Sequence, residues 1–211
     1  MTYLIISINI IMFIVESASG GSQNPEVAYR YGAMVVGAVE QGDIWRMVTC
    51  MFLHYGVVHL LGNMCSLFYI GPYVEMVFGK VKYLLIYLFG GTIGSIVAFC
   101  VDNYNHQNNL NVGASGAIFA LLGAILIIAI SKRFTNRPNV IAVIITIVVA
   151  IVPSIFLPNI SFSAHIGGLI GGFVVSLIAS RKLGTKKYGD EEVEQHEHGQ
   201  VIYYGTKPKN R

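Results

Sequence analysis

Six long apolar segments, separated by short polar stretches, run through most of the chain. A segment of about 20 apolar residues is long enough to cross the hydrocarbon core of a bilayer as an α-helix. We expect helices over residues 3–15 with an extension toward 19, 57–74, 83–101, 115–131, 140–157 and 162–180. The pattern therefore predicts an all-α membrane protein, a bundle of six transmembrane helices.

The connection between the first two predicted helices, Gly20 to Thr49, is long and mixes polar with apolar residues. It contains Trp45 and Arg46, a pair that suits the lipid headgroup layer, where an aromatic ring and a snorkelling cation are both satisfied. Two interpretations remain open. The loop is an ordinary interfacial anchor, or it is a membrane-associated loop that dips into the bilayer and braces the helices.

Basic residues predict the orientation of the bundle. Six spans leave both ends of the chain on one side, together with the loops that follow the second and fourth spans. That side holds 12 of the 14 Lys and Arg residues, leaving only Arg30 and Arg46 on the other. Because basic residues accumulate on the cytoplasmic side, we expect a multi-pass protein of a bacterial plasma membrane with both termini in the cytoplasm.

Composition supports a single membrane domain. The chain is 54% hydrophobic and only 12% charged, about half the charged fraction of soluble domains. We expect the membrane domain over residues 1–181 and a polar, disordered cytoplasmic tail over 182–211. The three cysteines have no metal-ligand spacing, so we expect no metal or organic cofactor. The lipid bilayer is an expected partner, and nucleic acid is not.

Ser115 lies between glycines at the start of the fourth span. Small residues at such a position often serve only to let transmembrane helices approach closely. A serine at a helix start can also be a nucleophile, because the free backbone N–H groups there can stabilise an oxyanion. A base within reach of the hydroxyl would decide between the two interpretations.

The predicted topology places three polar residues at one depth. Ser115, His165 and His59 each lie 16 residues before the inner end of their span, which is roughly 24 Å in a helix. Asn63 lies one turn deeper than His59 on the same face. Polar groups inside a membrane are costly and usually face a cavity or the bundle interior. These four residues therefore predict a site a short way below the outer surface.

The residue types at this depth suit peptide hydrolysis. Neutral His165 can accept the hydroxyl proton of Ser115 and return it to the leaving amine. With no carboxylate near His165 in sequence, we expect a Ser–His dyad, with His59, Asn63 and the Ser115 N–H as donors to the oxyanion. Phe119 lies one turn below Ser115 and is expected to stack on the His165 ring. Glycines below His165 would let another helix approach. Glu75 is expected to anchor a polar network.

At this point the chain resembles the rhomboid family of intramembrane serine proteases, in its minimal six-span bacterial form. Four motifs carry the resemblance over residues 1–181: Trp45-Arg46, His59-Leu60-Leu61-Gly62-Asn63, Gly113-Ala114-Ser115-Gly116 and Ala164-His165-x-x-Gly168-x-x-x-Gly172. The resemblance implies that Ser115 is the nucleophile, His165 the base, and His59 and Asn63 oxyanion ligands. It also implies substrates that are mostly single-span membrane proteins, cleaved near the outer end of their helix.

Two other functions compete with that of a serine endopeptidase. The first is a rhomboid-like protein that binds or escorts membrane clients without cleaving them. Inactive relatives generally lack the Ser or the His, and both are present here. The second is a small transporter, which would explain the intramembrane polar groups, but the sequence has no internal repeat and no charged pair at mid-membrane.

Overall fold

The computed structural model describes residues 1–134, 136–156, 160–181, 195–197 and 200–202. Its helices are α1 (Thr2–Ala18), α2 (Pro25–Tyr31), α3 (Val36–Glu40), α4 (Arg46–Thr49), the 3-10 turn η1 (Cys50–Phe52), α5 (Val57–Phe78), α6 (Lys80–Tyr104), α7 (Ser115–Ile130), α8 (Val140–Ile151), α9 (Pro153–Phe156) and α10 (Phe162–Arg181). The strands β1 (Gln195–Glu197) and β2 (Gln200–Ile202) pair antiparallel. Most of the tail predicted to be disordered lies outside the described residues.

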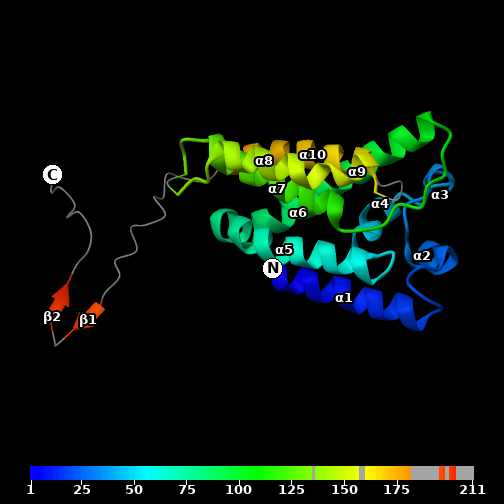
Figure 1. The fold of residues 1–211 in the computed structure, drawn as a ribbon, viewed down its shortest axis with the longest axis horizontal. Helices are drawn as coiled ribbons and strands as arrows, with labels where there is room; N and C mark the ends of the chain where they lie inside the picture. Colours follow the sequence, from blue (N-terminus) through cyan, green and yellow to red (C-terminus); the bar gives the residue numbers. More distant parts are fainter. Residues whose placement is uncertain (135, 157–159, 182–194, 198–199, 203–211) are drawn as a thin grey trace.

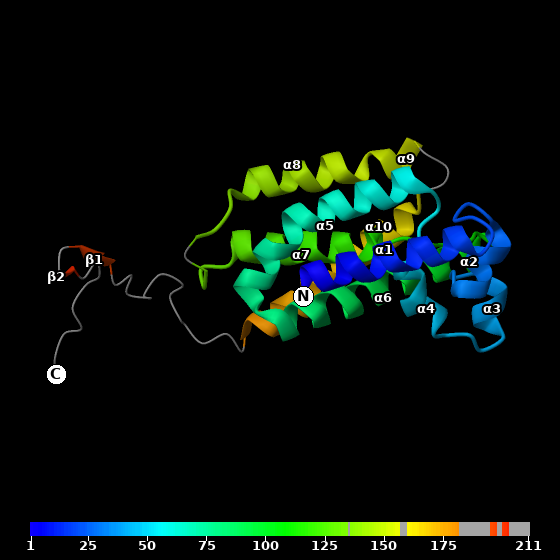
Figure 2. The same cartoon turned by 90° about the horizontal axis from the view of Figure 1, so that it is seen from below.

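The long helices lie side by side, and the short helices α2, α3 and α4 gather at one end of the bundle (Figures 1 and 2). Within the described residues, α5, α6 and α10 are each long and apolar enough to cross a membrane. Thr2–Ala18, Ser115–Ile130 and Val140–Phe156 are apolar but shorter. The structure therefore confirms a helical membrane domain.

The predicted spans agree with the helices except at four ends. Helix α6 begins at Lys80, three residues before its expected start. Helix α5 continues through Pro72 to Phe78, four residues beyond its expected end. Helix α6 reaches Tyr104, so Asp102 lies within the helix and is buried, although the predicted span ended one residue before it. Helix α8 ends at Ile151, and a separate turn, α9, begins at Pro153, because proline has no N–H to continue the helix.

Helices α6, α7 and α10 form the centre of the bundle, and α10 packs extensively on both of the others. Small residues make the contact close. A Cβ on Gly168 would collide with the backbone of Gly116 on α7, and one on Gly94 of α6 would lie 2.7 Å from the carbonyl of Ala164. The glycines predicted to let helices approach in fact form the helix contacts, and they hold α7 and α10 together at the level of Ser115.

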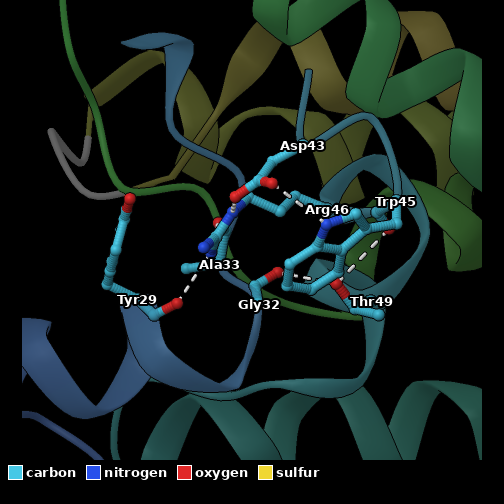
Figure 3. Close-up of polar contacts among 7 residues, drawn as sticks. All are labelled: Tyr29, Gly32, Ala33, Asp43, Trp45, Arg46 and Thr49. Carbon is cyan, nitrogen blue, oxygen red and sulfur yellow. Dashed lines mark hydrogen bonds and ion pairs between the residues drawn. The ribbon is translucent and has the colours of Figure 1, made fainter. Parts of the chain in front are cut away.

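Arg46 links the short helices of the first loop (Figure 3). Its side chain is buried, donates to the carbonyls of Tyr29 (2.7 Å) and Ala33 (3.2 Å), and pairs with Asp43 at 2.9 Å. The guanidinium also lies over the rings of Tyr29 and Trp45. The hydrogen bond from Arg46 holds the pKa of Asp43 below its usual value. This side chain therefore holds the short helices of the first loop together. Whether the loop lies at the membrane surface or dips into the bilayer stays a prediction.

Glu75, near the end of α5, accepts hydrogen bonds from the backbone N–H of Thr2 at 2.8 Å and from the Thr2 hydroxyl at 2.9 Å. It also pairs with the amino group of Met1. These bonds fasten α1 to the end of α5 that lies away from the first loop. The prediction that Glu75 anchors a polar network is confirmed.

Candidate active site

Ser115 is the first residue of α7, and the backbone just before it is shaped by Gly113. Gly113 has a φ of +123°, a conformation that side chains rarely allow, and its N–H donates to the Cys50 carbonyl at 2.9 Å. A Cβ at this position would lie 2.7 Å from Nε2 of His59. Glycine therefore lets the loop turn into α7 while its backbone lies against His59. The N–H groups in the first turn of α7 have no partner within the helix.

His165 lies on the first turn of α10 and is almost fully buried. Its ring stacks on Phe119 of α7, with ring centres 4.2 Å apart and planes 18° from parallel. The predicted stacking is therefore confirmed. Among the described residues neither ring nitrogen has a hydrogen-bond partner, so no bond joins His165 to Ser115 in this structure. Catalytic hydrogen bonds are often long before substrate binds.

The contact between α7 and α10 positions both residues. Gly116 follows Ser115 on α7, Gly168 lies about one turn after His165 on α10, and the two glycines meet at the helix interface. Because this contact holds the two helices together, the turn of α7 that carries Ser115 and the turn of α10 that carries His165 lie at one level. The arrangement agrees with the common level of Ser115 and His165 inferred from the sequence, and their depth in a bilayer stays a prediction.

All four residues predicted for the site line one cavity of about 1200 Å³. They are Ser115, His165, His59 and Asn63, and Phe119 lines the cavity with them. Asn63 on α5 is buried, and its side-chain Nδ2 has no partner within the described part of the chain. An unused donor that faces a cavity is available to a ligand oxygen. The cavity is also lined by Ile70 of α5 and Thr146 of α8.

Asp102 is a cavity residue whose role was missed in the sequence. Its carboxylate accepts hydrogen bonds from the side chains of Asn109 (2.9 Å) and Asn111 (2.8 Å). The backbone of Asn111 in turn pairs with Met34 of the first loop. Asp102 therefore holds the loop that leads to Ser115. The only signal in the sequence was a carboxylate followed by several asparagines.

His54 is a second residue whose position was not predicted. It is fully buried, and its ring meets the His59 ring edge-on, with centres 5.2 Å apart. Burial lowers its pKa to about 3, so the ring is neutral.

Cys50 lines the cavity but is not a competing nucleophile. Burial raises the pKa of its thiol to about 11, and a protonated thiol reacts poorly. Cys50 contacts the Ser95 hydroxyl at 3.4 Å. Among the described residues no group of three or more His, Cys, Asp or Glu side chains is placed to hold a metal ion. Ser115, His165, His59 and Asn63 bring a hydroxyl, two imidazoles and an amide to the cavity.

Comparison with known proteins gives a family match over residues 41–182, to the model described as Rhomboid domain. The chain is 40% identical to Rhomboid protease GluP of Bacillus subtilis (strain 168) over 189 residues, which is 89% of this chain and 36% of that protein. It is 36% identical to Putative rhomboid protease YdcA of the same organism, over 68% of this chain and 71% of that protein.

A plant protein is similar over the same region. RHOMBOID-like protein 5 of Arabidopsis thaliana is 37% identical over 151 residues, which cover 71% of this chain and 48% of that protein. The chain thus spans about a third of GluP and about half of the plant relative. In each case the similarity includes the greater part of this chain.

Proposed function

The chain belongs to the rhomboid family, and from this premise we propose that it is an intramembrane serine endopeptidase that cleaves transmembrane proteins. The observation that carries the proposal is the shared cavity, which brings Ser115 together with His165, His59 and Asn63. The names of GluP and YdcA, which describe those proteins as rhomboid proteases, support it.

In the proposed reaction, Ser115 Oγ attacks the carbonyl carbon of the scissile peptide bond while His165 accepts the hydroxyl proton. The C–N bond then breaks, His165 donates that proton to the leaving amine, and an acyl-enzyme remains on Ser115. A water molecule then attacks the ester carbonyl and gives a proton to His165. As the C–O bond to Ser115 breaks, His165 returns that proton to Oγ, which regenerates the serine and releases the carboxylic acid product. Stacking on Phe119 supports this role, because it fixes the plane in which the imidazole accepts and donates.

The tetrahedral intermediate carries a negative oxygen, which needs hydrogen-bond donors. We assign this role to the Asn63 amide, the His59 ring and the Ser115 backbone N–H. Two observations support the assignment: Asn63 Nδ2 has no hydrogen-bond partner in the described part of the chain, and Gly113 approaches His59 closely. Donors that are already aimed at the developing charge need no reorganisation during the reaction.

We further propose that α1, α5, α6, α7, α8–α9 and α10 all cross the bilayer, with both chain ends in the cytoplasm of a bacterial cell. The asymmetry of Lys and Arg supports this orientation. The cavity would then face a substrate near the outer boundary. Since an intact helix shields its peptide bonds, a substrate must unwind there, which is easiest at residues of low helix propensity.

The direct test is cleavage of a single-span model substrate by the purified protein in liposomes. Wild type should cleave near the outer end of the substrate helix, and both Ser115→Ala and His165→Ala should be inactive while remaining folded. His59→Ala and Asn63→Ala should each lower kcat by roughly 100-fold or more, the usual cost of losing one oxyanion donor. Some activity should remain, because the other donors are still present.

Cleavage by Ser115→Ala at the wild-type rate would refute the proposal. Binding of the substrate without cleavage by wild type would instead favour the alternative, a rhomboid-like protein that binds or escorts membrane clients.

A further inference from the structure

Glu16, a carboxyl group on α1, is fully buried but does not line the cavity. Its Oε2 accepts the backbone N–H of His54 at 3.2 Å. Burying such a group in a membrane helix is costly unless its bonds are used. This bond ties α1 to the segment that leads into α5.

His54 carries the connection from Glu16 to the site. The ring is fully buried and lies edge-on to the His59 ring, at an angle of 65°. Neither of its nitrogens has a hydrogen-bond partner within the described residues. The His54 ring is therefore held by packing and by its own backbone, whose N–H is bound to Glu16.

His59 is enclosed from two directions. The His54 ring lies against one side, and Gly113 approaches so closely that a Cβ there would lie 2.7 Å from both Cε1 and Nε2 of His59. An imidazole confined in this way keeps one orientation toward the cavity. Orientation matters because a hydrogen-bond donor must be aimed at the oxyanion before the reaction.

We propose that Glu16 is a positioning residue for His59. By holding the backbone of His54, it keeps the His54 ring in place behind His59, and so fixes the direction in which His59 donates. The inference rests on the proposed function, in which His59 binds the oxyanion. Glu16 itself touches neither substrate nor the reacting atoms.

Two substitutions of Glu16 test whether its hydrogen bond to the His54 backbone, and not its acidity, positions His59. Gln keeps an oxygen that can accept the His54 N–H, whereas Leu removes the acceptor. Asn9→Leu is a matched control, because Asn9 is also a fully buried polar residue of α1. Its side chain donates at 2.8 Å to the Ile5 carbonyl of its own helix.

The experiment measures kcat and KM for a model substrate in liposomes. Glu16→Leu should lower kcat about tenfold with little change in KM, less than the roughly 100-fold expected for removing a donor itself. Glu16→Gln and Asn9→Leu should stay within about twofold of wild type. In a His59→Ala background, Glu16→Leu should have no further effect, because residues that act as one unit are not additive.

An equal loss of kcat from Glu16→Leu with and without His59 would overturn the proposal, as would a kcat unchanged in Glu16→Leu. If Glu16→Leu does not fold, His54→Ala and His54→Phe provide the same test. His54→Ala should lower kcat because the ring is lost. His54→Phe should preserve kcat because an aromatic ring still packs against His59. A similar loss in both variants would contradict the inference.

The side-chain NMR signal of His59 gives a readout that does not depend on activity. It should shift in Glu16→Leu and stay unchanged in Asn9→Leu. If wild type does not cleave but the signal behaves in this way, the proposed function fails and the positioning stands. If wild type cleaves and the His59 signal is the same in Glu16→Leu, the positioning fails alone.

Discussion

Phe119 is the residue through which α7 holds the His165 ring. The two rings stack at 4.2 Å, and no hydrogen bond to a described residue fixes either imidazole nitrogen. The orientation of His165 before substrate arrives therefore depends on packing.

Replacing Phe119 by Leu should lower kcat about two- to tenfold, because aromatic stacking contributes roughly 0.5–1.5 kcal/mol beyond area burial. Phe119→Tyr should remain close to wild type. Initial cleavage rates in liposomes measure both. Phe68→Leu is the control, since Phe68 is exposed and meets the rings of Tyr3 and Tyr69 edge-on, away from His165. A fall in kcat of the same size in the control would show that stacking of Phe119 on His165 has no specific effect on kcat.

The residues of the site could be predicted because depth follows from counting along a helix. Counting along each helix from its predicted inner end gives the level of four residues: Ser115, His165, His59 and Asn63. The sequence alone therefore predicted that they lie close to one level. Asp102, His54 and Glu16 were not found, because their partners lie in loops or across helices. The spacing of residues along the sequence does not reveal such tertiary contacts.

At the scale of elements, the contact between α7 and α10 sets the distance between Ser115 and His165. Gly168 meets the backbone of Gly116, where no side chain can be accommodated without moving a helix. Van der Waals packing of small residues is a main source of helix association in lipid. The same contact thus stabilises the bundle and aligns the site.

Gly168→Ala should lower the free energy of unfolding by about 1–3 kcal/mol, the usual cost of overpacking, and should also reduce kcat by separating α7 from α10. Thermal unfolding in detergent and initial cleavage rates measure the two effects. Gly62→Ala is the control for stability, because a Cβ at Gly62 of α5 would meet nothing within 4 Å. Equal melting temperatures for Gly168→Ala and wild type would contradict the role of this contact.

The first loop depends on Arg46 in a comparable way. Arg46→Ala should destabilise the protein by about 2–3 kcal/mol, because it removes hydrogen bonds from a buried charged donor. The melting temperature should fall by several degrees, whereas Arg30→Ala should change the free energy of unfolding by less than about 0.5 kcal/mol. Arg30 is exposed on α2. Indistinguishable melting curves for the two variants would show that Arg46 does not brace the loop.

The long helices were predictable from apolar runs, but the structure of the first loop was not. Residues 25–31, 36–40 and 46–49 form helices of four to seven residues. Such helices are too short to be stable by propensity alone, so their formation depends on tertiary bonds such as those of Arg46. The break between α8 and α9 had a visible cause in Pro153, yet the length of the helix before it was overestimated.

At the scale of the whole molecule, the proposed orientation decides from which side a substrate reaches Ser115. A cysteine replacing Asn105, between α6 and α7, should react in intact cells with a maleimide that cannot cross membranes. A cysteine replacing Lys132, after α7, should react only after the cells are opened. Both are tested in a chain whose Cys50, Cys65 and Cys100 are replaced. Labelling of Lys132→Cys in intact cells would reverse the proposed orientation.

Covalent labelling tests most directly whether Ser115 is a nucleophile activated by His165. A fluorophosphonate should modify wild type at Ser115, as located by mass spectrometry of the labelled peptide. Labelling should be absent in Ser115→Ala and reduced at least 100-fold in His165→Ala, given the size of general-base catalysis. It should persist in Ser163→Ala, whose serine also lines the cavity. Wild-type labelling of Ser115 in His165→Ala, or modification of another serine instead, would contradict the account.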